Sequence, residues 1–96
     1  MKQEFTFILN ADNNFSVLNR IINVLNRRRV RIKRLMAHEN EDNFRRGGVL
    51  MLLFIAPDLV EKIKLQLEKL IEVDEVIVHE GSAAYFEQSE RIVDVD

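Results

Sequence analysis

The sequence predicts an α+β fold in which a four-stranded antiparallel sheet carries two helices on one face. Segments with an apolar period of two and segments with a period of 3.6 follow one another in the order strand–helix–strand–strand–helix–strand. The chain has 96 residues, which suits one small domain, because independent domains usually have roughly 100–150 residues.

The first half of the chain predicts a strand, a helix and a second, irregular strand. Residues 4–9, "EFTFIL", place Phe and Leu on one face with a period of two. The turn-forming "NADNN" then precedes a helix from Phe15 to about Arg28, whose apolar residues recur at i, i+3, i+4 and i+7. The next strand opens at Val30, but its alternation slips at Lys33–Arg34, which indicates a β-bulge or an edge strand.

The second half predicts a hairpin loop, a central strand, a helix and a last strand. Residues 38–48, "HENEDNFRRGG", are polar and end in glycine, as a loop does, whereas residues 49–56, "VLMLLFIA", are apolar on both faces and need cover on both sides. Pro57 starts the second helix, and residues 73–80, "VDEVIVHE", form the last strand. The core-facing residues of this helix are predicted to be Val60, Ile63, Leu67, Leu70 and Ile71.

This element order predicts a ferredoxin-like βαββαβ sandwich, built from two right-handed split βαβ units. The strand order across the sheet is then 4-1-3-2, with the third strand inside and the bulged second strand at an edge. We expect this domain to span residues 1–80, with residues 81–96 as a small acidic C-terminal tail.

Composition argues against several functions. The chain has no cysteine, so disulfides and thiolate sites are excluded, and its net charge of −2 gives no field that attracts nucleic acid or acidic lipid. No segment approaches the roughly 20 apolar residues that cross a bilayer, and the N-terminus does not fit a signal peptide, so we expect a cytoplasmic protein. His38 and His79 have no ligand spacing around them. We therefore expect no catalytic residues and no metal site.

Two segments resemble a known family. "QLEKLIEVDEV" (residues 66–76) is similar to its signature "QLNKLIDVLKV", and "LNRIINVLNRRRVRIKRL" (residues 18–35) aligns without a gap with its "LSRVVGLFSQRGYNIESL" type of segment. The family is that of the small regulatory subunits of acetolactate synthase (acetohydroxyacid synthase), which are ACT domains. The resemblance covers residues 4 to about 79, and the length is similar to that of the short small-subunit variant.

The resemblance implies a non-catalytic regulatory subunit in branched-chain amino acid biosynthesis. It implies two protein partners, a second copy in a homodimer and the catalytic large subunit, which holds thiamine diphosphate and magnesium. This chain would hold no cofactor, and a branched-chain amino acid such as valine would be its effector. The alternatives are a free-standing ACT amino-acid sensor for another enzyme and an RNA-binding ferredoxin-like module.

The resemblance also implies an effector site between two ACT domains, formed by the loop after the first strand of one and the start of the second strand of the other. The matching positions are Asn13, Ser16, Leu18, Arg31 and Ile32. Ser16 stands where the family has glycine, and Arg29 and Arg31 stand where its "RGYNI" motif has glycine and asparagine. Backbone N–H groups at the helix start are a further candidate for holding a carboxylate.

A basic segment coincides with the second strand. Residues 27–34, "RRRVRIKR", carry six positive charges in eight residues. RNA recognition on this fold needs aromatic residues that stack on bases, and "RRGGVLMLLF" lacks the aromatic pair, so we expect no nucleic-acid partner. We favour an edge strand whose charges prevent aggregation and contact an acidic partner surface. The acidic residues of the following loop, expected to neutralise part of this charge, are Glu39, Glu41 and Asp42.

Overall fold

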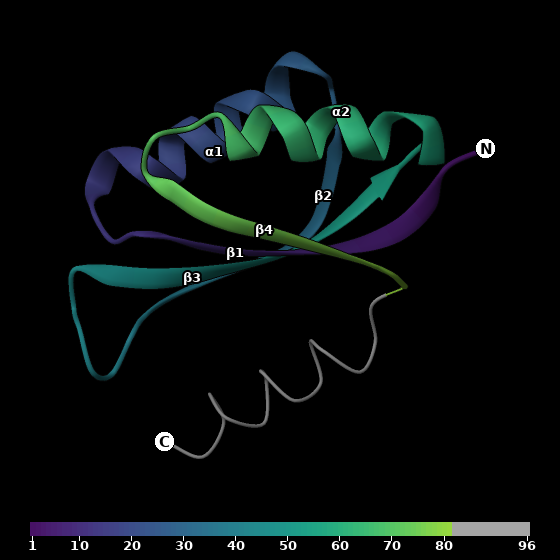
Figure 1. Ribbon diagram of the computed structural model, residues 1–96. Coiled ribbons are helices and arrows are strands. Elements are labelled where there is room, and N and C mark those ends of the chain that lie inside the picture. The colour runs from purple at the N-terminus through teal and green to yellow at the C-terminus, as the bar shows by residue number, and fades with distance from the viewer. Residues whose placement is uncertain (82–96) are drawn as a thin grey trace.

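The structure, a computed structural model, describes residues 1–81 and confirms the predicted element order (Figure 1). The elements are β1 (Gln3–Asp12), α1 (Phe15–Arg27), β2 (Arg31–Glu39), β3 (Arg46–Ile55), α2 (Pro57–Glu68) and β4 (Val73–Glu80). The strands form one antiparallel sheet in the predicted order β2-β3-β1-β4, and both helices cover the same face. The fold is a ferredoxin-like βαββαβ sandwich. The tail predicted at residues 81–96 lies outside the described residues, apart from Gly81.

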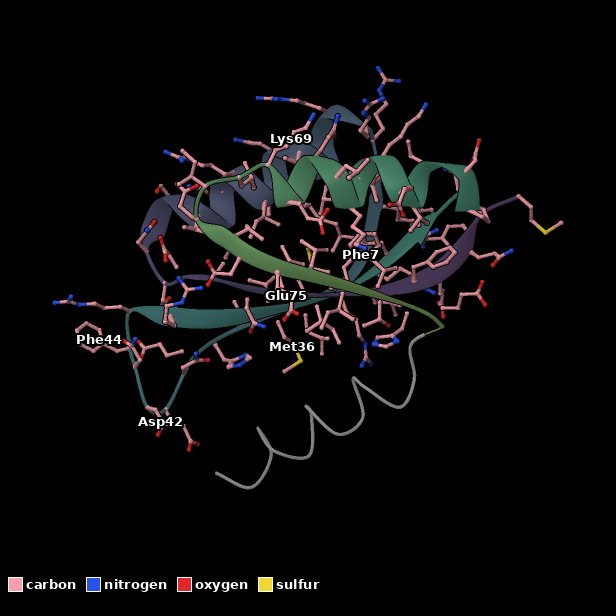
Figure 2. The ribbon with its side chains drawn as sticks, in the orientation of Figure 1. Phe7, Met36, Asp42, Phe44, Lys69 and Glu75 are labelled. Atoms are coloured by element: carbon pink, nitrogen blue, oxygen red, sulfur yellow. The ribbon has the colours of Figure 1, made fainter. Side chains whose placement is uncertain are left out.

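The core lies between the helices and one face of the sheet. Alternate residues of β1 and β3 point toward the helices, and Figure 2 shows Phe7 in this layer. The fully buried large side chains of the layer are Phe7, Leu9, Ile21, Leu25, Met51, Leu53, Ile55, Ile63 and Leu67. Neither helix of residues 1–81 is long and apolar enough to span a membrane.

The opposite face of the sheet, which α1 and α2 do not cover (Figure 1), is also largely apolar and is called the open face below. The strand registers place Ile8, Met36, Leu50, Leu52, Phe54 and Ile77 on it. Thr6 lies on this face too and is fully buried, and its hydroxyl donates a hydrogen bond of 2.6 Å to the carbonyl of Gly81. The amide of Gly81 donates to the carbonyl of Glu4 at 2.9 Å. These two bonds tie the end of β4 to β1.

Helix α1 is closed at both ends by local hydrogen bonds. Asn14 is the N-cap, and its Oδ1 accepts from the backbone amides of Ser16 (3.1 Å) and Val17 (3.2 Å). At the other end the amide of Val30 donates to the carbonyl of Leu25 at 3.0 Å, and a second such bond runs from Arg29 to Asn26 at 3.0 Å. This pair of bonds is a Schellman motif, which requires a left-handed residue after the cap.

Arg29 is that left-handed residue, with a φ of 54°. The resembling family carries glycine at this position, and glycine adopts such a φ without steric cost. The chain therefore keeps the turn that leads into β2, although arginine stands where glycine would adopt this conformation most easily.

The prediction that Ile71 faces the core is wrong. Helix α2 ends at Glu68, and the chain then turns, with the amide of Leu70 donating to the carbonyl of Leu67 at 3.1 Å. Beyond the helix end the 3.6-residue period no longer applies. Leu70 still packs against the core, but Ile71 is 94% exposed.

Three strand boundaries also differ from the prediction. β2 runs to Glu39, so His38 and Glu39 of the predicted loop belong to the strand. β1 continues to Asp12 and β3 starts already at Arg46, since these two residues form the last pair of the β1–β3 ladder and an ion pair. Arg46 also pairs with Asp74 at the start of β4. The predicted slip in β2 is confirmed, because the β2–β3 register shifts between Ile32 and Arg34.

We expect Arg29→Gly to raise the free energy of unfolding by up to about 1 kcal/mol. A left-handed conformation costs an L-residue roughly 1–2 kcal/mol, and the greater freedom of unfolded glycine offsets about 0.5–1 kcal/mol of that gain. Urea unfolding of the two proteins measures the difference.

The matched control is Arg28→Gly, because Arg28 has a φ of −96° and no strain to relieve. This control should lower stability by about 0.5–1 kcal/mol. An Arg29→Gly variant less stable than the parent would show that the positive φ carries no steric cost here.

Candidate ligand-binding site

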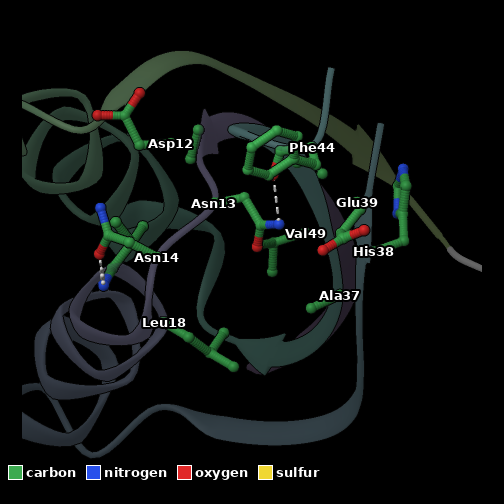
Figure 3. Close-up of a pocket in the computed structure, with 13 residues that line it drawn as sticks. Asp12, Asn13, Asn14, Leu18, Ala37, His38, Glu39, Phe44 and Val49 are labelled. Atoms are coloured by element: carbon green, nitrogen blue, oxygen red, sulfur yellow. Dashed lines mark hydrogen bonds between the residues drawn. The ribbon is translucent and has the colours of Figure 1, made fainter. Parts of the chain in front are cut away.

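A pocket of about 380 Å³ lies where β1 passes into α1, beside the β2–β3 hairpin (Figure 3). Its apolar lining consists of Ala11, Val17, Leu18, Ala37, Phe44 and Val49. Its polar lining consists of Asp12, Asn13, Asn14, His38 and Glu39, and Gly47 and Gly48 complete it. Small-molecule sites usually have about 300–1,000 Å³, so this pocket has room for one small metabolite.

The pocket exists because the helices leave the end of β2 uncovered and because β3 has a glycine there. Ala37 and Glu39 are on the helix side of β2 and are exposed. Gly47 pairs with Glu39 on β2 and with Ala11 on β1. A Cβ atom at Gly47 would lie 2.6 Å from the backbone carbonyl oxygen of His38, so no side chain fits at this point of the floor.

Asn13 joins the β1–α1 loop to the hairpin. Its side-chain Nδ2 donates to the carbonyl of Phe44 at 2.8 Å, and its backbone amide donates to the carbonyl of Arg45 at 2.8 Å (Figure 3). These two bonds hold the loop of residues 40–45 against the start of α1. The pocket wall is therefore built from segments that are far apart in sequence.

The amide groups at the start of α1 already have an acceptor. Asn14 Oδ1 accepts from the amides of Ser16 and Val17 and, at 2.8 Å, from the Ser16 hydroxyl. A carboxylate could bind these amides only by displacing the Asn14 side chain. The helix start thus differs from the open anion site that the sequence suggests.

The pocket has negative charge at its rim. Asp12 and Glu39 line it, and no lysine or arginine of residues 1–81 does. The charge of Asp12 is matched by Arg46, which lies between Asp12 and Asp74. Arg45 stacks on the Phe44 ring, 5.8 Å from its centroid, without lining the pocket.

The five predicted site residues fall into two groups. Asn13 and Leu18 line the pocket, and Ser16 lies beside it in the capping bonds of α1. Arg31 and Ile32 lie at the opposite end of β2, paired with Phe54 and Leu53. One chain therefore does not bring the two groups together, and the shared site stays a prediction.

Sequence reasoning did not place Glu39, Ala37 or Phe44 in the site. The available signal was the alternation of β2, which sets Ala37 and Glu39 on one face. No sequence pattern pointed to Phe44. It lies at the pocket because the Asn13 side chain donates a hydrogen bond to its backbone carbonyl. Within residues 1–81 no group of three histidines, cysteines or carboxylates could hold a metal ion.

The basic segment follows the sheet edge and packs on the open face. The guanidinium carbon of Arg31 and the Nζ atom of Lys33 lie 5.7 and 5.9 Å from the centroid of the Phe54 ring, and Lys33 also pairs with Glu4. Phe5 and Phe7 are in the core, which leaves Phe54 as the aromatic residue that the described strands present on the open face. Residues 1–81 therefore place no pair of stacking residues for RNA on this face.

The sheet order, the two helices on one face and the loop-side pocket define an ACT-type fold. The ACT domain of GTP pyrophosphokinase from Chlorobium tepidum matches with a TM-score of 0.70 and 12% identity, over 82% of this chain and 100% of that chain. The acetolactate synthase small subunit from Thermotoga maritima matches with a TM-score of 0.70 and 22% identity, over 79% of this chain and 47% of that chain. This chain thus spans about half the length of that subunit.

A third match comes from an enzyme of another kind. A homoserine dehydrogenase from Thiobacillus denitrificans matches with a TM-score of 0.68 and 16% identity, over 83% of this chain and 17% of that chain. No family model and no curated protein matches the sequence. At these identities the likeness establishes the ACT fold alone.

We expect Gly47→Ala to lower the free energy of unfolding by about 1–3 kcal/mol, as overpacking does. The new methyl group would meet backbone, the His38 carbonyl oxygen at 2.6 Å, which cannot move without disturbing β2. Gly48→Ala is the matched control. Its methyl group would meet the exposed His38 ring at 2.5 Å, and that side chain can rotate away. Urea unfolding compares the two, and equal losses would contradict this account of the pocket floor.

Proposed function

We propose that this chain is a non-catalytic regulatory ACT domain that binds a small amino acid in the pocket beside Asn13 and Leu18. The observation that carries the proposal is the position of the pocket. It opens at the loop between β1 and α1, which is where the family resemblance puts the effector. The ACT fold of the solved matches supports the same class of function.

The lining favours an aliphatic amino acid of the valine type. Val17, Leu18, Ala37 and Val49 give the cavity an apolar wall for a branched side chain. The amide of Asn13 and the carboxylate of Glu39 lie across the opening from each other (Figure 3). Such polar groups fix the orientation of a ligand whose apolar part is buried.

A homodimer would complete this site. β2 is an edge of the described sheet, so one side of its backbone is available for a further strand. Antiparallel pairing of two copies along β2 brings the start of one strand to the end of the other. Arg31 of the second copy would then lie beside the end of β2 that carries Glu39. Its side chain packs on Phe54 at the other face of the sheet in one chain, so it would have to turn toward the pocket to supply the cation that residues 1–81 do not place in the lining.

The enzyme that we propose as partner is the large subunit of acetolactate synthase, with its thiamine diphosphate and magnesium. Support comes from the 22% identity to the Thermotoga maritima small subunit and from the "QLEKLIEVDEV" segment. The regulatory chain would shift the conformational equilibrium of the catalytic subunit through ligand-dependent contacts. The matches to a GTP pyrophosphokinase domain and to a homoserine dehydrogenase favour, as the alternative, a sensor for another enzyme.

We expect calorimetry to show binding of valine, leucine or isoleucine by a dimer, and Arg31→Glu to weaken it about tenfold or more. The substituted carboxylate would repel the carboxylate of the ligand, and charge-assisted bonds of this kind contribute about 1.5–3 kcal/mol. Lys62→Glu on α2 is the control, because it makes the same charge change at an exposed position away from the pocket. A strictly monomeric protein at high concentration in sedimentation experiments would contradict the shared site.

We expect the purified chain alone to form no acetolactate from pyruvate with thiamine diphosphate and magnesium. Added to a cognate large subunit, it should change that subunit's turnover rate, and the two should co-purify. Turnover by the chain alone would overturn the regulatory proposal. Binding of an amino acid without any effect on the large subunit would instead favour the sensor for another enzyme.

A further inference from the structure

We propose that Glu39 makes the pocket selective for ligands that carry a protonated amine. The inference rests on the proposed function, since it concerns the same pocket. Glu39 is the last residue of β2, and Figure 3 shows its carboxylate turned into the cavity, toward Asn13 and Val49.

The backbone explains this orientation. Neighbouring residues of a strand point to opposite faces, so Ala37 and Glu39 share the helix side of β2, while the His38 ring lies on the other side of the strand (Figure 3). Gly47 is the residue directly across from Glu39 on β3. Because Gly47 has no side chain, the Glu39 carboxylate has room above the pocket floor.

The charge of Glu39 is available to a ligand. Within residues 1–81 its carboxylate takes part in none of the ion pairs, whereas Asp12 is paired with Arg46. Among the described residues, no lysine or arginine lines the pocket. A cation entering the pocket would therefore meet one carboxylate that has no competing partner from residues 1–81.

The acceptor oxygens of Glu39 and Asn13 suit a ligand group that donates hydrogen bonds. Asn13 uses its Nδ2 to donate to the Phe44 carbonyl, which leaves Oδ1 as an acceptor. The amides of Ser16 and Val17 are occupied by Asn14. An ammonium group has three N–H donors and a ligand carboxylate has none. Glu39 and Asn13 Oδ1 can thus bind the ammonium group.

The test is calorimetry with three probes that share one branched skeleton: valine, isobutylamine (amine without carboxylate) and 3-methylbutanoate (carboxylate without amine). For the parent protein we expect 3-methylbutanoate to bind at least about tenfold more weakly than valine, since charge-assisted hydrogen bonds are the strong ones. Glu39→Gln should weaken the binding of valine and isobutylamine about three- to tenfold and should not weaken that of 3-methylbutanoate, whose carboxylate Glu39 repels.

Glu41→Gln is the matched control, because Glu41 lies in the same hairpin, is exposed and does not line the pocket. It removes the same charge and should bind all three probes as the parent does. Urea unfolding of both variants checks that each is folded, and the ranking of the probes on the parent protein tests the inference without any substitution.

The outcomes separate this inference from the proposed function. Valine bound equally well by the parent and by Glu39→Gln would overturn the role of Glu39 and leave the amino-acid pocket in place. Isobutylamine bound in a Glu39-dependent manner, with no binding of valine, would support the role of Glu39 and overturn the amino-acid proposal. No binding of any probe would overturn both.

Discussion

The antiparallel ladder between β1 and β3 is the constraint on which the rest of the structure depends. It runs without a shift from the pair Gln3–Ile55 to the pair Asp12–Arg46. A slip of one residue would move every core side chain of a strand to the open face. At its last pairs the ladder sets the hairpin beside the β1–α1 loop, so the register that fixes the core also fixes the pocket.

Strongly periodic segments could be predicted from the sequence, and most segment ends could not. The slip in β2 and the bounds of β4 follow from local alternation, and the strand order follows from the two right-handed split βαβ units. Ile71 and Asp12 were misplaced because a turn after α2 and a partner on β3 decide their environments. For the site, resemblance led to Asn13 and Leu18. It did not lead to Phe44, whose place depends on a hydrogen bond across 31 residues of sequence.

The chain retains the backbone of an ACT domain while changing the chemistry at the ends of β2. Arg29 keeps the left-handed turn before the strand without glycine. Basic residues gather at the start of β2, and Glu39 lies at its end. A strand that is positive at one end and negative at the other is complementary in charge to an antiparallel copy of itself, which agrees with the homodimer proposed above.

The hydrogen bonds from Gly81 to β1 have a mechanical consequence. β1 and β4 are antiparallel, with Phe5 opposite Glu80, so the first residues of β1 lie beside the last residues of β4. Tension that separates these two ends acts along the hydrogen bonds between the strands, which are perpendicular to the strand axis. The bonds would break in sequence, starting at Thr6 and Gly81, and β4 would peel away while β1 remained paired with β3. Under such tension the pairing of β1 with β4 is therefore the first contact of the described fold to open.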